Sequence, residues 1–167
     1  MDMPVQIKQI GDDAGLTASL AVIRESFQTV ALQFGLTWKN CPTHASFITM
    51  EKLVDLSRKA QLYGLFEDDT QVGFIAIEKG SDGRYFLDRL AVSPRFRRIG
   101  HGRRLVEFVL KQVKSAGGSR VSLGMIDGHI ELKRWYEKLG FVETGKRTFH
   151  HLPFTVCFMD YIFQGNR

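Results

Sequence analysis

The amino-acid sequence predicts a single α/β domain of the α+β kind, with a mixed, mostly antiparallel central sheet of about seven strands and about four flanking helices. Three apolar segments follow one another with only short polar turns between them, which is typical of an antiparallel meander: residues 62–67, 71–78 and 84–92. An amphipathic segment at 102–116 then leads to another apolar run at 120–125. Because such a helical crossover joins parallel strands, the run at 120–125 is expected beside 84–92 in parallel orientation.

The segments before this meander add one strand and two helices. Residues 5–10 alternate between apolar and polar side chains and predict a first strand. Apolar residues recur at helical spacing over 14–34, and Gly35 is expected to end this helix. Residues 36–45 have no clean period and predict a loop, and 47–61 predicts a second helix.

The segments after the crossover complete the sheet. Gly117-Gly118 is expected to stop the helix at 102–116, and a last helix is expected over 129–139 with Gly140 as its left-handed cap. Residues 141–151 and 154–163 then predict a closing hairpin through Leu152-Pro153.

Composition narrows the class of protein. A chain of 167 residues corresponds to about one domain, taken as 1–167, and 44% apolar with 25% charged residues excludes a disordered tail. No run approaches the roughly 20 apolar residues of a membrane span, and the first residues lack the pattern of a secretory signal. We therefore expect a soluble cytoplasmic protein without a membrane partner. Cys41 and Cys157 are expected to be free thiols, because they are too few and too far apart for a disulfide framework or a Cys-x-x-Cys metal site, and we expect no metal.

A basic, glycine-bearing loop stands between the strand at 84–92 and the helix at 102–116. Its residues are Arg97, Arg98, Ile99, Gly100, His101, Gly102 and Arg103. The first N–H groups of a helix have no intrahelical partner and carry partial positive charge, so they attract anions. Glycines permit close approach of a phosphate to these amides, and arginines add charge-assisted contacts. The loop therefore predicts a phosphorylated ligand.

Spacing separates three kinds of phosphate loop. The Walker A pattern occurs nowhere in the chain. A dinucleotide fingerprint would need a third glycine where Leu105 stands, although Asp127 remains available in that hypothesis as a ribose-binding acid. The pattern Arg/Gln-x-x-Gly-x-Gly/Ala is satisfied by Arg97, Gly100 and Gly102.

At these residues the chain resembles the GCN5-related N-acetyltransferase (GNAT) family, in which this pattern cradles the pyrophosphate of acetyl-coenzyme A. A second motif of that family, Trp-Tyr-Glu-Lys-Leu-Gly-Phe, follows at 135–141. The resemblance implies a GNAT-like fold, acetyl-coenzyme A as cosubstrate and an amine-bearing small molecule or protein as acceptor. The family often has Asn where His129 stands, and His129 is expected to contact the pantetheine arm.

The chemistry of acetyl transfer suggests roles for particular residues. Tyr136 is the candidate acid for the departing thiolate, because a phenol of pKa about 10 can protonate a thiolate whose thiol has pKa about 8.5. A main-chain N–H near Leu90, Ala91 and Val92 is expected to polarise the thioester carbonyl, with the main chain there pairing with pantetheine. Asp88 is expected on the same strand face as Leu90. It is either the general base or a partner of Arg84 or Arg89.

The sequence says less about the acceptor and about the oligomeric state. Trp38, His44, Phe149 and Phe154 would line an aromatic acceptor pocket, or else pack in the core. The net charge of +5 is concentrated at the basic loop, so we expect no nucleic-acid partner, and a homodimer is conceivable. The alternatives are a non-catalytic coenzyme A-binding module, then a dinucleotide-dependent oxidoreductase, and last a nucleic-acid binder.

Overall fold

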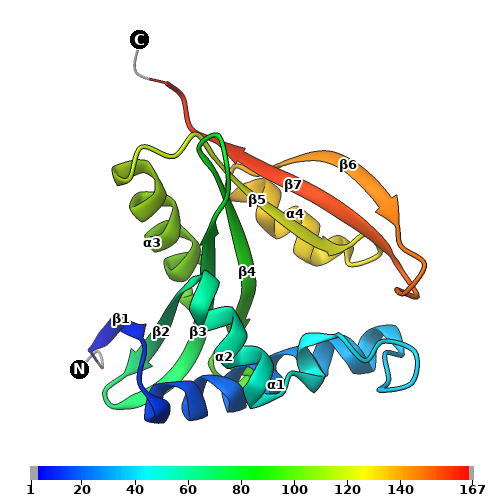
Figure 1. Cartoon of the computed structure of the whole chain (residues 1–167), viewed down its shortest axis with the longest axis horizontal. Helices are drawn as coiled ribbons and strands as arrows, with labels where there is room; N and C mark the ends of the chain where they lie inside the picture. The colour runs from blue at the N-terminus through cyan, green and yellow to red at the C-terminus, as the bar shows by residue number, and fades with distance from the viewer. Residues whose placement is uncertain (1–3, 166–167) are drawn as a thin grey trace.

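The computed structural model describes residues 4–165 and forms one seven-stranded sheet with helices on both faces (Figure 1). The strands are β1 (Val5–Ile10), β2 (Gln61–Glu67), β3 (Thr70–Lys79), β4 (Arg84–Val92), β5 (Arg120–Ile126), β6 (Val142–Thr148) and β7 (Thr155–Ile162). The α-helices are α1 (Asp13–Phe34), α2 (Met50–Lys59), α3 (His101–Ser115) and α4 (Ile130–Lys138), and two short 3-10 helices are η1 (Ala45–Phe47) and η2 (Pro94–Phe96). The predicted fold class is confirmed.

The strand order is β1-β2-β3-β4-β5-β7-β6, and every neighbouring pair is antiparallel except β4 and β5. The parallel pair is the one that the crossover through α3 predicted. Gly35 ends α1 as predicted, with φ of 64°, and Gly140 adopts the predicted left-handed conformation, with φ of 104°. These local signals were reliable because left-handed backbone is open to glycine at little steric cost.

Two predicted elements, the second helix and the closing hairpin, have wrong boundaries. The second helix begins at Met50 rather than at residue 47, because the Thr49 side chain caps it by accepting a hydrogen bond from the Lys52 N–H at 3.3 Å. It ends at Lys59, since Gln61 already pairs with Ile77 in the sheet. The closing hairpin is shorter than predicted, and residues 149–154 form its connection.

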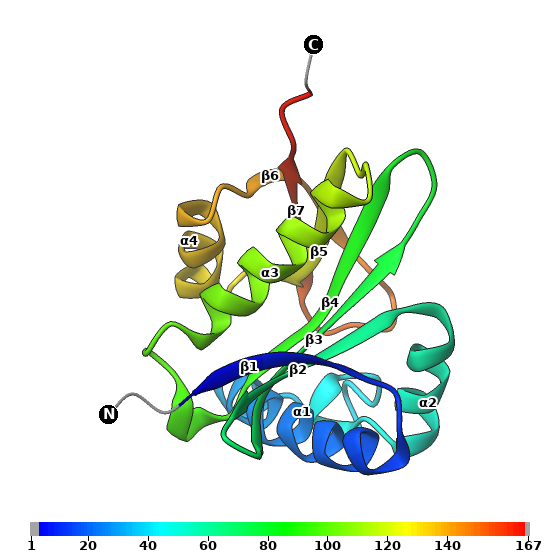
Figure 2. The ribbon, with the colours of Figure 1, turned by 90° about the vertical axis from the view of Figure 1, so that its left-hand side faces the viewer.

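The helices divide between the two faces of the sheet (Figure 2). Helices α1 and α2 pack on one face around Ile23, Leu53 and Phe74. Helices α3 and α4 pack on the other face, around Leu105 and Phe141. The sheet is therefore the middle of three layers, with a separate hydrophobic core on each face.

Strands β4 and β5 separate along their length (Figure 1). They pair only from Arg84 with Arg120 to Phe86 with Ser122. Beyond this point β4 stays with β3 as far as Val92, whereas β5 stays with β7 as far as Ile126. Main-chain groups on the facing edges of the two strands are thus left without the ladder that a continuous sheet would give them.

Both cysteines are buried free thiols, as predicted. Among residues 4–165, no helix combines the length and the apolar character that crossing a bilayer requires.

Candidate active site

A cleft of about 770 Å³ opens where β4 and β5 separate, and it continues between α1, the start of α3 and α4. Most of the predicted site residues line it: Asp88, Leu90, Val92, Arg97, Arg98, Gly100, His101, Gly102, Arg103, His129 and Tyr136. Two predicted residues lie elsewhere. Ala91 is fully buried in the core under α1 and α2, and Ile99 is 63% exposed outside the cleft.

The start of α3 forms one end of this cleft. Gly100 is the N-cap residue, with φ of 94°, and no side chain caps the helix. A Cβ atom at this position would meet nothing within 4 Å, so the glycine is required by its left-handed backbone and leaves open space in front of the helix. The N–H groups at this uncapped helix start face open space and are suited to binding an anion.

Arg97 has a different role from the one predicted. Its guanidinium donates to the carbonyl oxygens of Val92 (3.1 Å) and Ser26 (2.8 Å), and to the hydroxyls of Thr29 (2.9 Å) and Ser26 (3.1 Å). These bonds occupy most of its five N–H donors. The expectation that this side chain contacts phosphate is therefore corrected: it ties the basic loop and the end of β4 to α1.

The side chain of His101 also has a partner within the protein. Its Nε2 lies 2.7 Å from Glu67 Oε1 at the end of β2, and both side chains are largely buried. At this first position of α3, only the main chain of His101 remains for a phosphate. Exposed charge at the loop comes instead from Arg98 and Arg103.

Gly102 is constrained by a neighbouring helix. A Cβ atom at this position would lie 3.3 Å from Trp135 Cζ2 and 3.4 Å from Cη2. The sequence motif explains this glycine only by the close approach of a phosphate to the helix start. In the structure the glycine also lets the start of α3 pack against Trp135 of α4.

We expect Gly102→Val to raise the dissociation constant of coenzyme A tenfold or more, about 1.4 kcal/mol, because the added methyl groups would displace Trp135, which itself lines the cleft. Calorimetric titration with coenzyme A measures it. Gly145→Val is the matched control, since Gly145 lies in β6 with nothing within 4 Å of its Cβ position. Unchanged affinity in a folded Gly102→Val protein would place the phosphate site elsewhere.

A β-bulge interrupts β4 at the middle of the cleft wall. Phe74 pairs with Ala91 and Ala76 pairs with Asp88, so two residues, Arg89 and Leu90, stand opposite a single one on β3. Arg89 has φ of 53°, a left-handed conformation that costs a non-glycine residue roughly 1–2 kcal/mol.

The bulge corrects the predicted position of Asp88. Asp88 stands opposite Ala76, which faces the core under α1 and α2, whereas Leu90 packs against the core under α3 and α4. The two residues therefore lie on opposite faces, because the extra residue Arg89 breaks the alternation on which the prediction depended.

Asp88 is half-buried at the cleft and forms no ion pair within residues 4–165. One alternative use of this carboxylate was an ion pair with Arg84 or Arg89. Arg84 instead reaches Asp160, at 4.0 Å. The carboxylate of Asp88 is thus available to a group inside the cleft.

The main chain of Val92 already has partners in the protein. Its N–H donates to Ser26 Oγ at 3.3 Å, and its carbonyl oxygen accepts from Arg97 Nε at 3.1 Å. The expectation that Val92 pairs with pantetheine amides is corrected accordingly, and Leu90 at the bulge is the remaining cleft-lining position for such pairing.

Tyr136 lies on α4 and is 5% exposed at the cleft wall. Its ring packs edge-on against Trp135, at 5.0 Å between centroids, and against Phe141, at 5.4 Å. Burial raises the pKa of the Tyr136 phenol well above its usual value. The hydroxyl is therefore neutral and carries its proton across the physiological range.

His129 precedes the first turn of α4 at the rim of the cleft. Its ring packs against Phe34 at 5.3 Å between centroids, and its buried Nδ1 has no hydrogen-bond partner within residues 4–165. Burial lowers the pKa of His129, opposed by Glu131 and reinforced by Arg97, so the ring is neutral at pH 7. An unpaired buried nitrogen at a cleft is a position that a ligand can satisfy.

Another part of the cleft is lined by residues from α1, from the segment before η1, from the bulge of β4 and from the connection between β6 and β7. We call this part the acceptor end: Phe27, Cys41, Thr43, His44, Arg89 and Phe154. Burial and the charge of Arg89 lower the pKa of His44 to about 4, so His44 is neutral. Its Nδ1 accepts a hydrogen bond from the Ser46 N–H at 3.3 Å.

The predicted aromatic pocket is only half present. His44 and Phe154 line the cleft, but Trp38 and Phe149 do not. Trp38 is 61% exposed and packs edge-on against Phe47, outside the cleft. Sequence reasoning missed Cys41 and Thr43, which no motif marks, and it left Arg89 without a site role because the bulge has no sequence signal.

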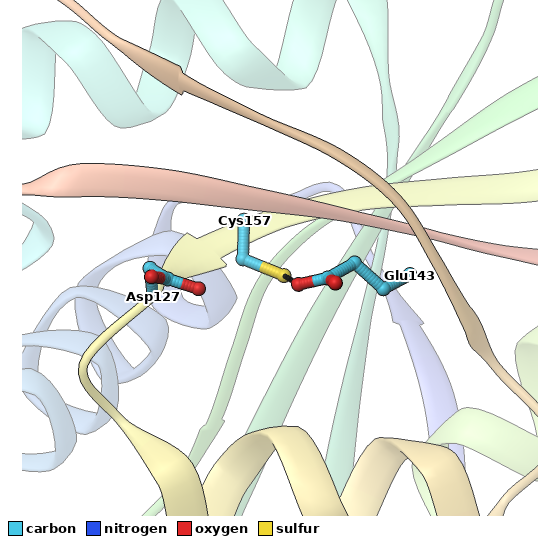
Figure 3. Close-up of side chains that lie close together, drawn as sticks. All are labelled: Asp127, Glu143 and Cys157. Atoms are coloured by element: carbon cyan, nitrogen blue, oxygen red, sulfur yellow. Dashed lines mark hydrogen bonds between the residues drawn. The ribbon is translucent and has the colours of Figure 1, made fainter.

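A second group of polar side chains comes from just after β5 and from strands β6 and β7 (Figure 3). The ligand-type atoms of Asp127, Glu143 and Cys157 lie within 4.8 Å of one another. Lys133 Nζ lies 2.7 Å from Asp127 and 3.2 Å from Glu143, so an ammonium group already occupies the position between the carboxylates. Burial and the hydrogen bond to Glu143 at 3.0 Å raise the pKa of Cys157 to about 11, which keeps it a thiol.

These contacts make the group an ion-pair network that joins α4 to the β6–β7 hairpin. Lysine bonding lowers the pKa of Asp127, so this carboxylate is engaged within the protein rather than open to a ribose. The oxidoreductase hypothesis, which needed Asp127 as a ribose-binding acid, loses its remaining support.

The fold is shared with several solved acetyltransferase structures. The ribosomal-protein-S18-alanine N-acetyltransferase of Escherichia coli superimposes with a TM-score of 0.76 at 16% identity, over 97% of both chains. PaiA N-acetyltransferase from Thermoplasma acidophilum, in complex with coenzyme A, gives 0.74 at 19% identity, over 96% of this chain and 100% of that one. Ard1 from Thermoplasma volcanium gives 0.74 at 23% identity, over 96% and 99%.

Sequence comparison gives the family directly. No curated protein matches this chain. The profile described as "Acetyltransferase (GNAT) family" matches residues 26–141, which include β4, the basic loop and α4. This protein therefore belongs to the GNAT family of acetyltransferases.

Proposed function

We propose that this protein is an N-acetyltransferase that transfers the acetyl group of acetyl-coenzyme A to an amine, by direct attack within a ternary complex. The observation that carries the proposal is the position of Tyr136, a buried and neutral proton donor in the same cleft as the uncapped start of α3. Family membership and the coenzyme A in the PaiA complex add to it.

The residues present fit the coenzyme. Open space in front of Gly100 leaves room for a pyrophosphate at the α3 amides, with charge from Arg98 and Arg103. Leu90 provides main chain at the bulge for pantetheine, and the unpaired Nδ1 of His129 provides one further hydrogen-bonding position. When bound, the coenzyme supplies an acetyl thioester.

Side chains of the protein accept and donate the protons of the reaction. The amine nitrogen bonds to the thioester carbonyl carbon, and the carbon–sulfur bond breaks. Asp88 receives the proton that the amine loses, directly or through water, and Tyr136 gives its proton to the departing sulfur. A main-chain N–H near the bulge stabilises the developing oxyanion. The products are the N-acetylated amine and the free thiol of coenzyme A.

Calorimetric titration with acetyl-coenzyme A, followed by a broad amine screen that detects thiol release, tests the function. Saturable binding with turnover on at least one amine is expected. Absence of saturable binding at millimolar acetyl-coenzyme A would exclude the proposal.

A non-catalytic coenzyme A-binding module is the second candidate. The observation that favours it is His129, a neutral ring packed on Phe34 at the position where the family often has Asn. Coenzyme binding without turnover on any amine in the same screen would support this candidate instead.

Replacing Asp88 by Asn is expected to lower the turnover number about tenfold, since water can carry part of the proton transfer, and to leave the affinity for acetyl-coenzyme A unchanged. Steady-state kinetics with calorimetry measure both values. Asp69→Asn, in the exposed β2–β3 turn, is the control and should retain wild-type turnover. Wild-type turnover in Asp88→Asn would remove Asp88 from the mechanism.

A further inference from the structure

Arg89 is a cation without a partner in the cleft wall. It is half-buried, it lines the cleft, and it forms no ion pair within residues 4–165. Its Nε is buried, and no group in that part of the chain accepts a hydrogen bond from it. Because a buried charged donor without an acceptor is costly, an arginine in this state at a cleft is typical of a site that a ligand completes.

The positive charge of Arg89 influences another residue of the acceptor end. It acts on His44, whose ring lies beside Phe27 of α1 at 5.7 Å between centroids. The other arginines of the cleft belong to the basic loop around the start of α3, and Arg97 among them is already bonded to α1. Among the residues that the structure describes, Arg89 is therefore the cation of the acceptor end.

The carboxylate beside Arg89 complements it. Asp88 also lines the cleft, and the two neighbours form no ion pair with each other. They are consecutive residues at the bulge, where Arg89 has a left-handed conformation. Two adjacent, unpaired and opposite charges match a molecule that carries an amino group and an acidic group close together.

We propose that Arg89 recognises a carboxylate on the acceptor, so that the acceptor is a small amino acid or a similar molecule with a carboxylate near its amino group. The amine role of this molecule rests on the proposed function, whereas the carboxylate contact can be measured separately. Arg89 binds the acid group, and Asp88 faces the amine.

A carboxylate fits better than a phosphate. The planar fork of a guanidinium matches a carboxylate with two parallel hydrogen bonds. Among residues 4–165, Arg89 supplies the one positive charge of the acceptor end, which matches the single charge of a carboxylate. A dianionic phosphate would bring a second negative charge that has no cation and would be repelled more strongly by Asp88.

The test is calorimetric binding to protein saturated with coenzyme A, the free thiol, so that no transfer occurs. Each common amino acid is compared with its own carboxamide. The amino acid that binds most tightly is expected to do so at least tenfold more tightly than its carboxamide, because the amide removes the charge-assisted pair. Arg89→Gln is expected to lose this preference, and Arg89→Lys to keep part of it because it keeps the charge without the fork.

Arg58→Gln is the matched control, since Arg58 is exposed on α2 and pairs with Asp55. It should keep the full preference for the acid over the amide. Circular dichroism of each variant establishes that it is folded.

Equal affinity for acid and amide, no binding of any amino acid, or an intact preference in Arg89→Gln would each overturn the inference. Tighter binding of O-phosphoethanolamine than of any amino acid would overturn the choice of carboxylate. Acetylation of amines without a carboxylate preference would overturn this inference and leave the proposed function standing. Arg89-dependent binding of amino acids without turnover would support it and contradict the proposed function.

Discussion

Tyr136→Phe is expected to lower the turnover number by roughly 10²-fold while the affinity for coenzyme A changes little. The phenylalanine keeps the ring that packs against Trp135 and Phe141, so α4 keeps its place. The change removes only the hydroxyl, which burial keeps protonated at physiological pH by raising its pKa. General acids commonly contribute 10²–10⁴-fold, which sets the expected size. Steady-state kinetics on any accepted amine, with calorimetry for the coenzyme, measure both quantities.

Tyr161→Phe is the matched control for this change. Tyr161 packs against Phe141 at 5.6 Å between centroids, but it lies on β7 and does not line the cleft. Its variant should turn over like the wild type. If Tyr136→Phe also does so, Tyr136 is a packing residue and another proton donor must be sought.

Arg97→Met is expected to lower the free energy of unfolding by about 3 kcal/mol and to weaken coenzyme A binding as well. Methionine preserves much of the aliphatic stem but loses four hydrogen bonds, and hydrogen bonds from a charged group are each worth about 1.5–3 kcal/mol without being additive. The carbonyl oxygens of Ser26 and Val92 are left without this donor. Coenzyme affinity falls because the basic loop is no longer held against α1.

Chemical denaturation and calorimetry measure these two effects. Arg95→Met provides the comparison, because Arg95 is exposed and, among residues 4–165, its guanidinium makes only a contact over the Phe96 ring, at 5.7 Å. The free energy of unfolding of Arg95→Met should stay within about 0.5 kcal/mol of the wild type. An equally small change in Arg97→Met would show that the hydrogen bonds of Arg97 do not hold the loop.

Local patterns predicted the fold class well. The meander, the crossover through α3 and the glycine caps depend on residues close together in the sequence, and they are found as predicted. The basic loop and the tyrosine of α4 were expected to share a site, and both line one cleft. Such features are predictable because backbone conformation and amphipathic periods are set by near neighbours.

The roles of individual side chains were less predictable. Arg97 and His101 belong to the same loop motif, but Arg97 bonds to Ser26 and Thr29, and His101 bonds to Glu67. Each partner is more than 30 residues away in the sequence. A motif gives the position of a side chain along the chain, but not the distant group that it meets.

The sequence by itself determined the order and type of the elements and the family resemblance, because both are encoded in local pattern and spacing. Only the tertiary structure decided that β4 and β5 separate into a cleft and that Arg97 bonds to α1. It also decided that Asp88 and Arg89 both line this cleft without a mutual ion pair. The physical reason is that strand separation, bulges and hydrogen-bond partners arise from contacts between distant segments, and one extra residue in a strand reverses the face of every side chain after it.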